Sequence, residues 1–299
     1  MDVSVIIVNY NTKDLLDNCL KSLYKHTKDL EFEIIVVDNA STDYSQEFIK
    51  SSFPDVILIE SETNLGFGKA NNLGAQYAKG EFLFILNSDT ILLENSINTL
   101  FEFYKKNSYD LNIGVIGALM IDENFKINGF GSEFPNCRSE IRNILSTLPV
   151  IKKIVPPKSN KNYPIQDAFF EIDYVLGADM FVSADIFNRF KGFSNDFFMY
   201  YEESDLQKRI RDSGLKNYII STTKIIHLED GSGKKINNYS NTKRIIVHES
   251  KNIYLKKNDF KKFHFYKIID FSFLLLNLIN YKYSFKENRN YFSKIIKTY

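Results

Sequence analysis

The chain has 299 residues, of which 44% are apolar and 25% are charged. This composition supplies a substantial hydrophobic core and excludes disorder over any long segment. The two cysteines, Cys19 and Cys137, belong to no pairing motif, so a disulfide scaffold is excluded and a reducing compartment is favoured.

The charge is divided unevenly along the chain. Of its 38 basic and 37 acidic residues, fifteen and four lie in 234–299, so this part carries +11 and residues 1–233 carry −10. We therefore expect a domain at 1–233 and a separate basic, aromatic-rich helical region at 234–299. Met1 leads directly into an apolar strand without a signal peptide, which predicts a cytoplasmic protein.

Strand and helix patterns alternate through the first hundred residues. Ser41 or Thr42 is a plausible N-cap of the second helix. The apolar runs predict strands at 3–8, 32–37, 56–59 and 82–86, and apolar residues at helical spacing predict helices at 15–23, 44–49, 64–77 and 97–104. This alternation with short connections is typical of an α/β fold with a doubly wound, mostly parallel sheet flanked by helices.

The regular alternation of strands and helices ends after a further predicted strand at 113–121. Residues 122–170 contain five prolines and are predicted to be irregular, with loops and short helices that cover one end of the sheet. Regular structure is then expected at 174–182, in a helix from 184, in a helix through 202–210, in short strands at 218–220 and 225–227, and in helices over 240–299.

Polar clusters follow several of these strands. They are Asp38-Asn39, Asn87-Ser88-Asp89 and Glu202-Glu203-Ser204-Asp205. Ligands of open α/β sheets bind outside the carboxyl ends of the strands, where a carboxylate can hold a cation that serves a phosphate. The alternative is that Asn87 and Asp89 only form a turn or cap the next helix.

The residue types suit a nucleotide diphosphate. Asp38 offers an acceptor for the imide N–H of a pyrimidine. Asn64 and Gly66 precede a helix N-terminus, whose N–H groups favour anions. Asp89 can hold Mn²⁺ or Mg²⁺, and the 202–205 carboxylates can activate an incoming hydroxyl.

Five segments together resemble the inverting glycosyltransferases of family 2, which have the GT-A fold. They are Val-Ser-Val-Ile-Ile-Val-Asn-Tyr-Asn at 3–11, Val-Val-Asp-Asn-Ala-Ser-Thr-Asp at 36–43, Asn-Leu-Gly-Phe-Gly-Lys-Ala-Asn-Asn at 64–72, Leu-Asn-Ser-Asp at 86–89 and Gly-Phe-Ser-Asn-Asp-Phe-Phe-Met-Tyr-Tyr-Glu-Glu-Ser-Asp-Leu at 192–206. The similarity covers roughly residues 2–232 and looks closest to the rhamnosyltransferase-like branch. In this order the motifs are specific, although each alone is weak.

The resemblance implies a nucleotide-sugar site. The matching positions are Val8, Asn9, Tyr10 and Asp38 at the nucleoside, Asn64, Gly66, Phe67 and Asn71 in the pocket, Asn87 and Ser88 in the metal motif, and Gly177, Ala178 and Asp179 at the donor sugar and acceptor. Asn87 replaces the first Asp of the family's Asp-x-Asp motif, so Asp89 is implied as the main metal ligand, with His227 completing the site. Without the family, His227 reads as a structural histidine.

The family's Glu-Asp pair corresponds to Glu202-Glu203, which implies Glu203 as the catalytic base. This departs from the usual Asp, so Glu202 and Asp205 remain alternatives. Asp205 and Arg209 are four residues apart on a helix and can simply pair with each other.

The resemblance implies transfer of a sugar from dTDP-rhamnose or a UDP-hexose, with Mn²⁺ or Mg²⁺, to a growing bacterial surface glycan on a lipid carrier. The basic region at 240–299 suits an anionic membrane surface, which would make the protein peripheral on the inner face of the membrane. The alternatives are a region that packs on the acidic domain or forms a homo-oligomer. The apolar run at 271–279 is too short to span a bilayer.

Other classes fit less well. A dinucleotide-binding oxidoreductase needs a glycine-rich turn after the first strand, where this chain has Asn9-Tyr10-Asn11-Thr12. A sugar nucleotidyltransferase would have a glycine-rich loop with a basic residue there. A non-catalytic sugar-nucleotide-binding subunit stays open because Asn87 and Glu203 depart from the common pattern. No readout motif supports nucleic-acid binding.

Overall fold

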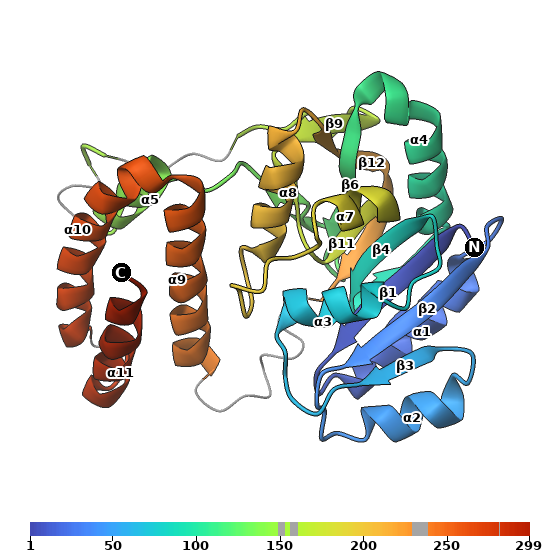
Figure 1. Ribbon diagram of the computed structural model, residues 1–299, viewed down its shortest axis with the longest axis horizontal. Helices are drawn as coiled ribbons and strands as arrows, with labels where there is room; N and C mark the ends of the chain where they lie inside the picture. The colour runs from blue at the N-terminus through green and yellow to red at the C-terminus, as the bar shows by residue number, and fades with distance from the viewer. Residues whose placement is uncertain (149–152, 156–160, 229–238, 281) are drawn as a thin grey trace. The chain divides into compact units, whose positions relative to one another are not determined.

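The computed structural model describes residues 1–148, 153–155, 161–228, 239–280 and 282–299. These residues form two compact units (Figure 1). The first contains 1–133, 163–198 and 202–228, and the second contains the described residues of 134–162, 199–201 and 239–299. The predicted domain boundary between residues 233 and 234 lies outside the described residues and stays a prediction.

The first unit is built on one mixed sheet. Its spatial order is β3-β2-β1-β4-β11-β6-β12-β5, with β7 beside β6 and β9 beside β12. The strands are β1 (Val3–Asn9), β2 (Phe32–Asp38), β3 (Ile57–Glu60), β4 (Phe82–Asn87), β5 (Thr90–Leu92), β6 (Ile113–Ile121), β7 (Ile127–Gly129), β9 (Phe169–Ile172), β11 (Asp179–Ser183) and β12 (Lys216–His227). Strands β3, β2, β1 and β4 are parallel, and β11 is antiparallel to both of its neighbours.

Helices cover both faces of this sheet (Figure 1). Phe82, Phe84 and Leu86 of β4 pack on one face, and Leu83 and Ile85 pack on the other. The first face is covered by α1 (Lys13–His26), α2 (Ser45–Ser52) and α4 (Ser96–Leu111), and the second by α3 (Phe67–Ala75), α7 (Ala184–Arg189) and α8 (Glu202–Asp212). The α/β prediction, with the GT-A arrangement, is confirmed.

Three local predictions are wrong. Helix α2 begins at Ser45 after Tyr44 in the left-handed region (φ 64°), so neither Ser41 nor Thr42 is its N-cap. Helix α3 ends at Ala75, before Tyr77. The two short strands at 218–220 and 225–227 are parts of β12, because the strand passes through its polar middle with a register shift between Ile220 and Lys224.

The second unit is helical, as predicted for its C-terminal part. It contains α5 (Cys137–Ser146), α9 (Tyr239–Asn258), α10 (Phe260–Leu276), the 3₁₀ turn η2 (Asn277–Ile279), α11 (Phe285–Ile295) and η3 (Ile296–Thr298). Ile245, Leu274 and Ile295 pack together in its core. No helix in the described part of the chain has the length and apolar character needed to cross a bilayer.

A buried polar network ties the C-terminal helices together. Asp270 Oδ2 lies 2.7 Å from His248 Nε2 and accepts a 2.7 Å hydrogen bond from the Tyr299 hydroxyl. The Tyr291 hydroxyl lies 2.5 Å from His248 Nδ1. Burial lowers the pKa of His248, so the neutral imidazole is favoured within this network.

Candidate active site

The carboxyl ends of β1 and β2 meet side by side, with Asn9 in register with Asp38. Both side chains are fully buried, and Asn9 Nδ2 donates to Asp38 Oδ1 at 2.8 Å. Thr12 Oγ1 donates to Asn9 Oδ1 at 2.7 Å. The parallel register therefore joins two predicted nucleoside residues directly, with the half-buried Val8 and Tyr10 on either side of Asn9 in the chain.

Asp38 is also held by its own loop. Its Oδ2 accepts from the Ser41 N–H at 2.9 Å and from Gln46 Nε2 at 2.6 Å. Both carboxylate oxygens thus have protein donors, and Oδ1, with one donor, keeps the larger remaining capacity for a ligand.

Asn39 fixes the turn that leads into α3. Its amide Nδ2 donates to Asn64 Oδ1 at 2.9 Å, and its Oδ1 accepts from the Leu65 N–H at 2.8 Å. The Gly66 N–H donates to Asn64 Oδ1 at 2.9 Å. The Phe67 N–H donates to Phe198 O at 2.9 Å. The N–H groups of residues 65–67 already form hydrogen bonds within the protein. They therefore stabilise the loop and do not bind the predicted anion.

Gly66 needs its missing side chain. Its φ of +81° lies in the region that favours glycine, and a Cβ there would fall 2.0 Å from Phe198 O. One turn further along α3, Asn71 is fully buried and donates to Phe67 O at 3.0 Å. Within the described chain, Asn71 Oδ1 has no hydrogen-bond partner.

The turn after β4 brings three predicted residues to His227. Asp89 Oδ1 lies 3.3 Å from His227 Nε2, and Asn87 Nδ2 lies 3.4 Å from the same nitrogen. Pairing of β12 with β5 sets this geometry, because His227 is in register with Thr90. Ser88 Oγ lies 2.9 Å from Thr12 Oγ1, so this turn also contacts the residue that donates to Asn9.

Cys19 lies below this turn and is not a nucleophile candidate. It is fully buried, with Sγ 3.7 Å from Asn87 O. Burial raises the pKa of its thiol to about 12, which leaves no thiolate near neutral pH.

Gly177 and Ala178 connect the β4 turn to the first turns of α3 and α8. Ala178 O accepts from the Asn87 N–H at 3.0 Å. A Cβ on Gly177 would lie 3.1 Å from the Phe67 ring and 3.6 Å from Glu203 Cβ. Hydrogen bonds and chain neighbours therefore lead from Asp38 through Asn9, Thr12, Ser88, Asn87 and Ala178 to Gly177, and Glu203 lies beside Gly177.

The first turn of α8 carries the three carboxylates in different surroundings. Glu202 is buried, and its Cγ would lie 3.4 Å from a Cβ on Gly68. Asp205 is fully buried, and its Oδ2 accepts from Arg209 Nε at 3.0 Å. Glu203 is half-buried on the side that faces Gly177.

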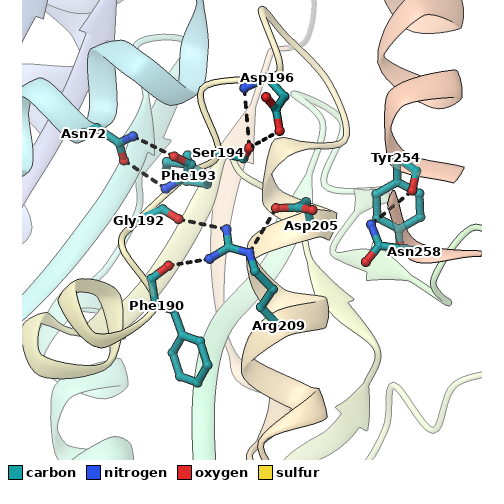
Figure 2. Close-up of polar contacts among 10 residues, drawn as sticks. All are labelled: Asn72, Phe190, Gly192, Phe193, Ser194, Asp196, Asp205, Arg209, Tyr254 and Asn258. Carbon is teal, nitrogen blue, oxygen red and sulfur yellow. Dashed lines mark hydrogen bonds and ion pairs between the residues drawn. The ribbon is translucent and has the colours of Figure 1, made fainter. Parts of the chain in front are cut away.

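Figure 2 shows the hydrogen bonds and the ion pair that the Arg209 guanidinium forms. Besides the Asp205 carboxylate, its guanidinium donates to the carbonyls of Phe190 and Gly192. Nearby, Asn72 exchanges two hydrogen bonds with the backbone of Phe193, at 2.8 and 2.9 Å. Asp205 and Arg209 therefore brace the 190–193 segment, as their helical spacing allowed.

From the sequence, no supporting role was assigned to several residues that hold the predicted ones in place, among them Asn39 of the Asp38-Asn39 cluster and Asp179, which the resemblance placed with Gly177 and Ala178. Thr12, Asn39 and Gln46 bond directly to Asn9, Asn64 and Asp38, respectively. Asp179 is fully buried, and its Oδ2 accepts from the Ala118 N–H at 2.7 Å. The polar residues just after β1 and β2 were a visible signal, whereas nothing local marked Asp179 as a partner of β6.

The donor set at Asp89 and His227 suits a divalent ion that is shared with a phosphate. Among the described residues, no cluster of three His, Cys, Asp or Glu side chains could hold a metal. Ions of the Mg²⁺ type are commonly held by one or two carboxylates plus substrate phosphates rather than by an all-protein cage. One carboxylate and one imidazole at 3.3 Å fit that arrangement.

The chain resembles known proteins in both sequence and fold. Residues 4–150 match the family model described as "Glycosyl transferase family 2". The poly(ribitol-phosphate) beta-glucosyltransferase of Bacillus spizizenii is 34% identical over 124 residues, which cover 40% of this chain and 20% of that protein. The chain spans less than two thirds of the length of the relatives that it matches.

Two solved structures share the fold. S. aureus TarS 1–349 in complex with UDP-GlcNAc has a TM-score of 0.56 and 15% identity, over 100% of this chain and 72% of that one. GalNAc-T7 with UDP, GalNAc and Mn²⁺ has a TM-score of 0.55 and 20% identity, over 85% of this chain and 49% of that one.

Proposed function

Because residues 4–150 match the model of glycosyl transferase family 2, we propose that the protein transfers a sugar from a nucleotide diphosphate to a hydroxyl of a bacterial surface glycan. The observation that carries this proposal is the contact path from Asp38 to Glu203. In this proposal, the path connects the residues assigned to the nucleoside, to the metal ion and to the catalytic base.

The nucleoside end is assigned to the carboxyl ends of β1 and β2. Asn9 and Asp38 fix each other, so Asp38 Oδ1 presents an acceptor in one orientation. Asn64, Gly66, Phe67 and Asn71 line the donor pocket in this proposal. The unpartnered Oδ1 of Asn71 supports it, because a buried acceptor gains from a ligand hydroxyl or N–H.

Asp89 and His227 would hold Mn²⁺ or Mg²⁺, with Asn87 and Ser88 shaping the turn. When bound, such an ion supplies positive charge against the charge that develops on the departing diphosphate. The Mn²⁺ in the GalNAc-T7 structure supports this assignment.

Glu203 is the proposed base. Glu202 is buried against Gly68 and Asp205 is paired with Arg209, whereas half-buried Glu203 flanks Gly177 at the acceptor end. The acceptor oxygen forms a bond to the anomeric carbon while the bond from that carbon to the diphosphate oxygen breaks with its electron pair. The acceptor proton passes to the Glu203 carboxylate, and a single displacement inverts the anomeric carbon.

A UDP-hexose is the first donor to test, because two solved structures with a similar fold contain UDP-GlcNAc or UDP with GalNAc. dTDP-rhamnose is the second donor to test, because the sequence motifs resemble the rhamnosyltransferase-like branch of the family. The name of the Bacillus spizizenii relative favours a polyol-phosphate surface polymer as acceptor. We also propose that the growing glycan is lipid-linked, so that the protein works at a membrane surface.

A thermal-shift panel of UDP-GlcNAc, UDP-glucose, UDP-GalNAc and dTDP-rhamnose, each with Mn²⁺ or Mg²⁺, tests the donor assignment, because native-state binding raises the melting temperature. Transfer from the best donor to a ribitol-phosphate oligomer, followed by NMR of the new anomeric centre, tests the reaction. Inverted product is expected. Binding without transfer to any acceptor would favour the non-catalytic subunit, and consumption of a nucleoside triphosphate with a sugar 1-phosphate would favour the nucleotidyltransferase.

A further inference from the structure

Helix α10 exposes a row of apolar side chains on one side, with the exposed Ser272 among them. Phe265, Ile268 and Leu275 are 63%, 66% and 45% exposed, and Leu276 and Ile279 are 51% and 82% exposed. Steps of three, seven and four residues put 265, 268, 275 and 279 along one side of the helix and its η2 extension. We define these five residues as the α10 ridge.

The opposite side of α10 is already used for the fold. Phe263, Tyr266, Asp270 and Leu274 are buried in the second unit. The helix is therefore apolar on both sides, with one side packed and the other open to solvent. A row of large exposed apolar side chains is more often an interaction surface than a chance arrangement.

The acidic residues from 259 to 299 form hydrogen bonds within the second unit. Asp270 holds His248 and Tyr299, Asp259 accepts from the Cys137 N–H at 3.0 Å, and Glu287 accepts from the Ser284 hydroxyl at 2.7 Å. The basic side chains point outward instead. The exposed ones from residue 259 on are Lys261, Lys262, Lys282, Lys286, Arg289, Lys294 and Lys297.

We propose that α10 docks on an anionic phospholipid bilayer, with the α10 ridge inserted at the headgroup level and the exposed Lys261 and Lys262 of the same helix on lipid phosphates. Exposed apolar side chains flanked by lysines are the features that hold an interfacial helix. A self-complementary contact between two copies would instead bring like charges together across a twofold axis. The charge of the segment therefore favours a negatively charged partner over a second copy.

The inference deepens the proposed function, because it names the surface through which the enzyme would reach a lipid-linked acceptor. Its binding test does not depend on the donor or the acceptor. Electrostatic attraction contributes about a fivefold gain in partitioning for each cation near an anionic surface, so binding must weaken in salt.

The test is co-sedimentation of the full chain with vesicles of phosphatidylglycerol and phosphatidylcholine, or of phosphatidylcholine alone, at low and high salt. We expect binding to the anionic vesicles at low salt. Ile268→Ser with Ile279→Ser should reduce partitioning by about tenfold or more, and Lys261→Gln with Lys262→Gln by about twentyfold. The matched controls are Tyr109→Ser, at a side chain 91% exposed on α4, and Lys106→Gln, also exposed on α4, both with unchanged binding.

Two results would overturn the inference. One is wild-type protein that ignores anionic vesicles at low salt. The other is unchanged vesicle binding by the ridge variants, together with loss of a dimer in light scattering, which would make the ridge a contact between copies. Transfer to a water-soluble acceptor, measured on the same samples, should be unaffected by the ridge variants. Vesicle binding without any transfer would count against the proposed function and leave the docking surface standing.

Discussion

Arg209 Nε donates to the Asp205 carboxylate at 3.0 Å, and the same guanidinium donates to the carbonyls of Phe190 and Gly192 (Figure 2). Asp205 has no exposed surface, whereas Arg209 is 29% exposed on its side chain. One ion pair thus anchors the segment before α8. Asp205 therefore has a structural role in this ion pair, whereas Glu203, two residues earlier on the same helix, is the proposed base.

Asp205→Asn should therefore act on stability. Removing one partner of a buried ion pair leaves the other charge poorly compensated and costs about 3 kcal/mol. Urea denaturation measures this loss. Asp212→Asn is the control, because Asp212 pairs with Lys208 on the same helix while 62% exposed, and its loss should stay within about 0.5 kcal/mol. A stable but inactive Asp205→Asn protein would make Asp205 the base.

His227→Ala should weaken metal binding. It removes the imidazole that lies 3.3 Å from Asp89 and leaves the carboxylate alone. The Mn²⁺ concentration needed to raise the melting temperature in the presence of UDP should increase by about tenfold or more. His264→Ala, at an exposed histidine on α10, is the control. An unchanged Mn²⁺ requirement for His227→Ala would remove this histidine from the proposed site.

Asp179 should make stability depend on pH. Burial raises the pKa of this carboxyl well above its usual value of 3.8, while its Oδ2 accepts from the Ala118 N–H. The native state keeps a proton that the unfolded chain releases above about pH 4. The stability that this proton gives is full below that pH and is lost as the pH rises toward the native pKa.

The Asp179→Asn variant has no titratable group at this position. Comparing it with wild type therefore isolates the pH dependence that Asp179 contributes. Its free energy of unfolding relative to wild type should rise by up to about 1.4 kcal/mol per pH unit between pH 4 and the native pKa. Denaturation at a series of pH values measures the difference. A difference that stays constant with pH would show that Asp179 is ionised in the folded protein.

Gly66→Ala should damage the loop before α3. The substitution adds a Cβ that meets Phe198 O at 2.0 Å in a backbone with φ +81°. Strain of this kind costs about 1–3 kcal/mol, and donor binding should weaken with it. Gly214→Ala is a matched control, because Gly214 has φ +95° but nothing within 4 Å of the added Cβ. Equal stability losses in the two variants would assign the whole effect to φ rather than to Phe198.

The sequence predicted the parts of the fold that local patterns encode. The apolar runs of β1, β2, β4 and β6 gave the sheet, and the spacing of Asp205 and Arg209 gave their pairing. It did not reveal that β11 lies antiparallel between β4 and β6, because strand order depends on tertiary packing. For the same reason, the contact of Gly177 with Phe67 and Glu203 had no local signal.

Polar residues caused two of the local errors. Ser221 and Thr222 interrupt the apolar pattern of β12, yet the strand continues because the Ser221 N–H bonds to Ala168 O at 2.9 Å. The N-cap of α2 was assigned to Ser41 or Thr42, but Asp43 Oδ1 accepts from the Ser45 N–H at 3.2 Å instead. Short helices were expected within 122–170, and α5 is one, but contacts such as Cys137 with Asp259 group residues 134–148 with the C-terminal helices.

The central claim is that Glu203, at the first turn of α8, removes the acceptor proton. The most direct test is the kcat of Glu203→Gln with the best donor and a soluble acceptor, alongside the donor KM and the melting temperature. We predict a kcat lower by about a hundredfold to ten-thousandfold, with the donor KM and the melting temperature unchanged. A Glu203→Gln protein that turns over at a rate near wild type would contradict the account.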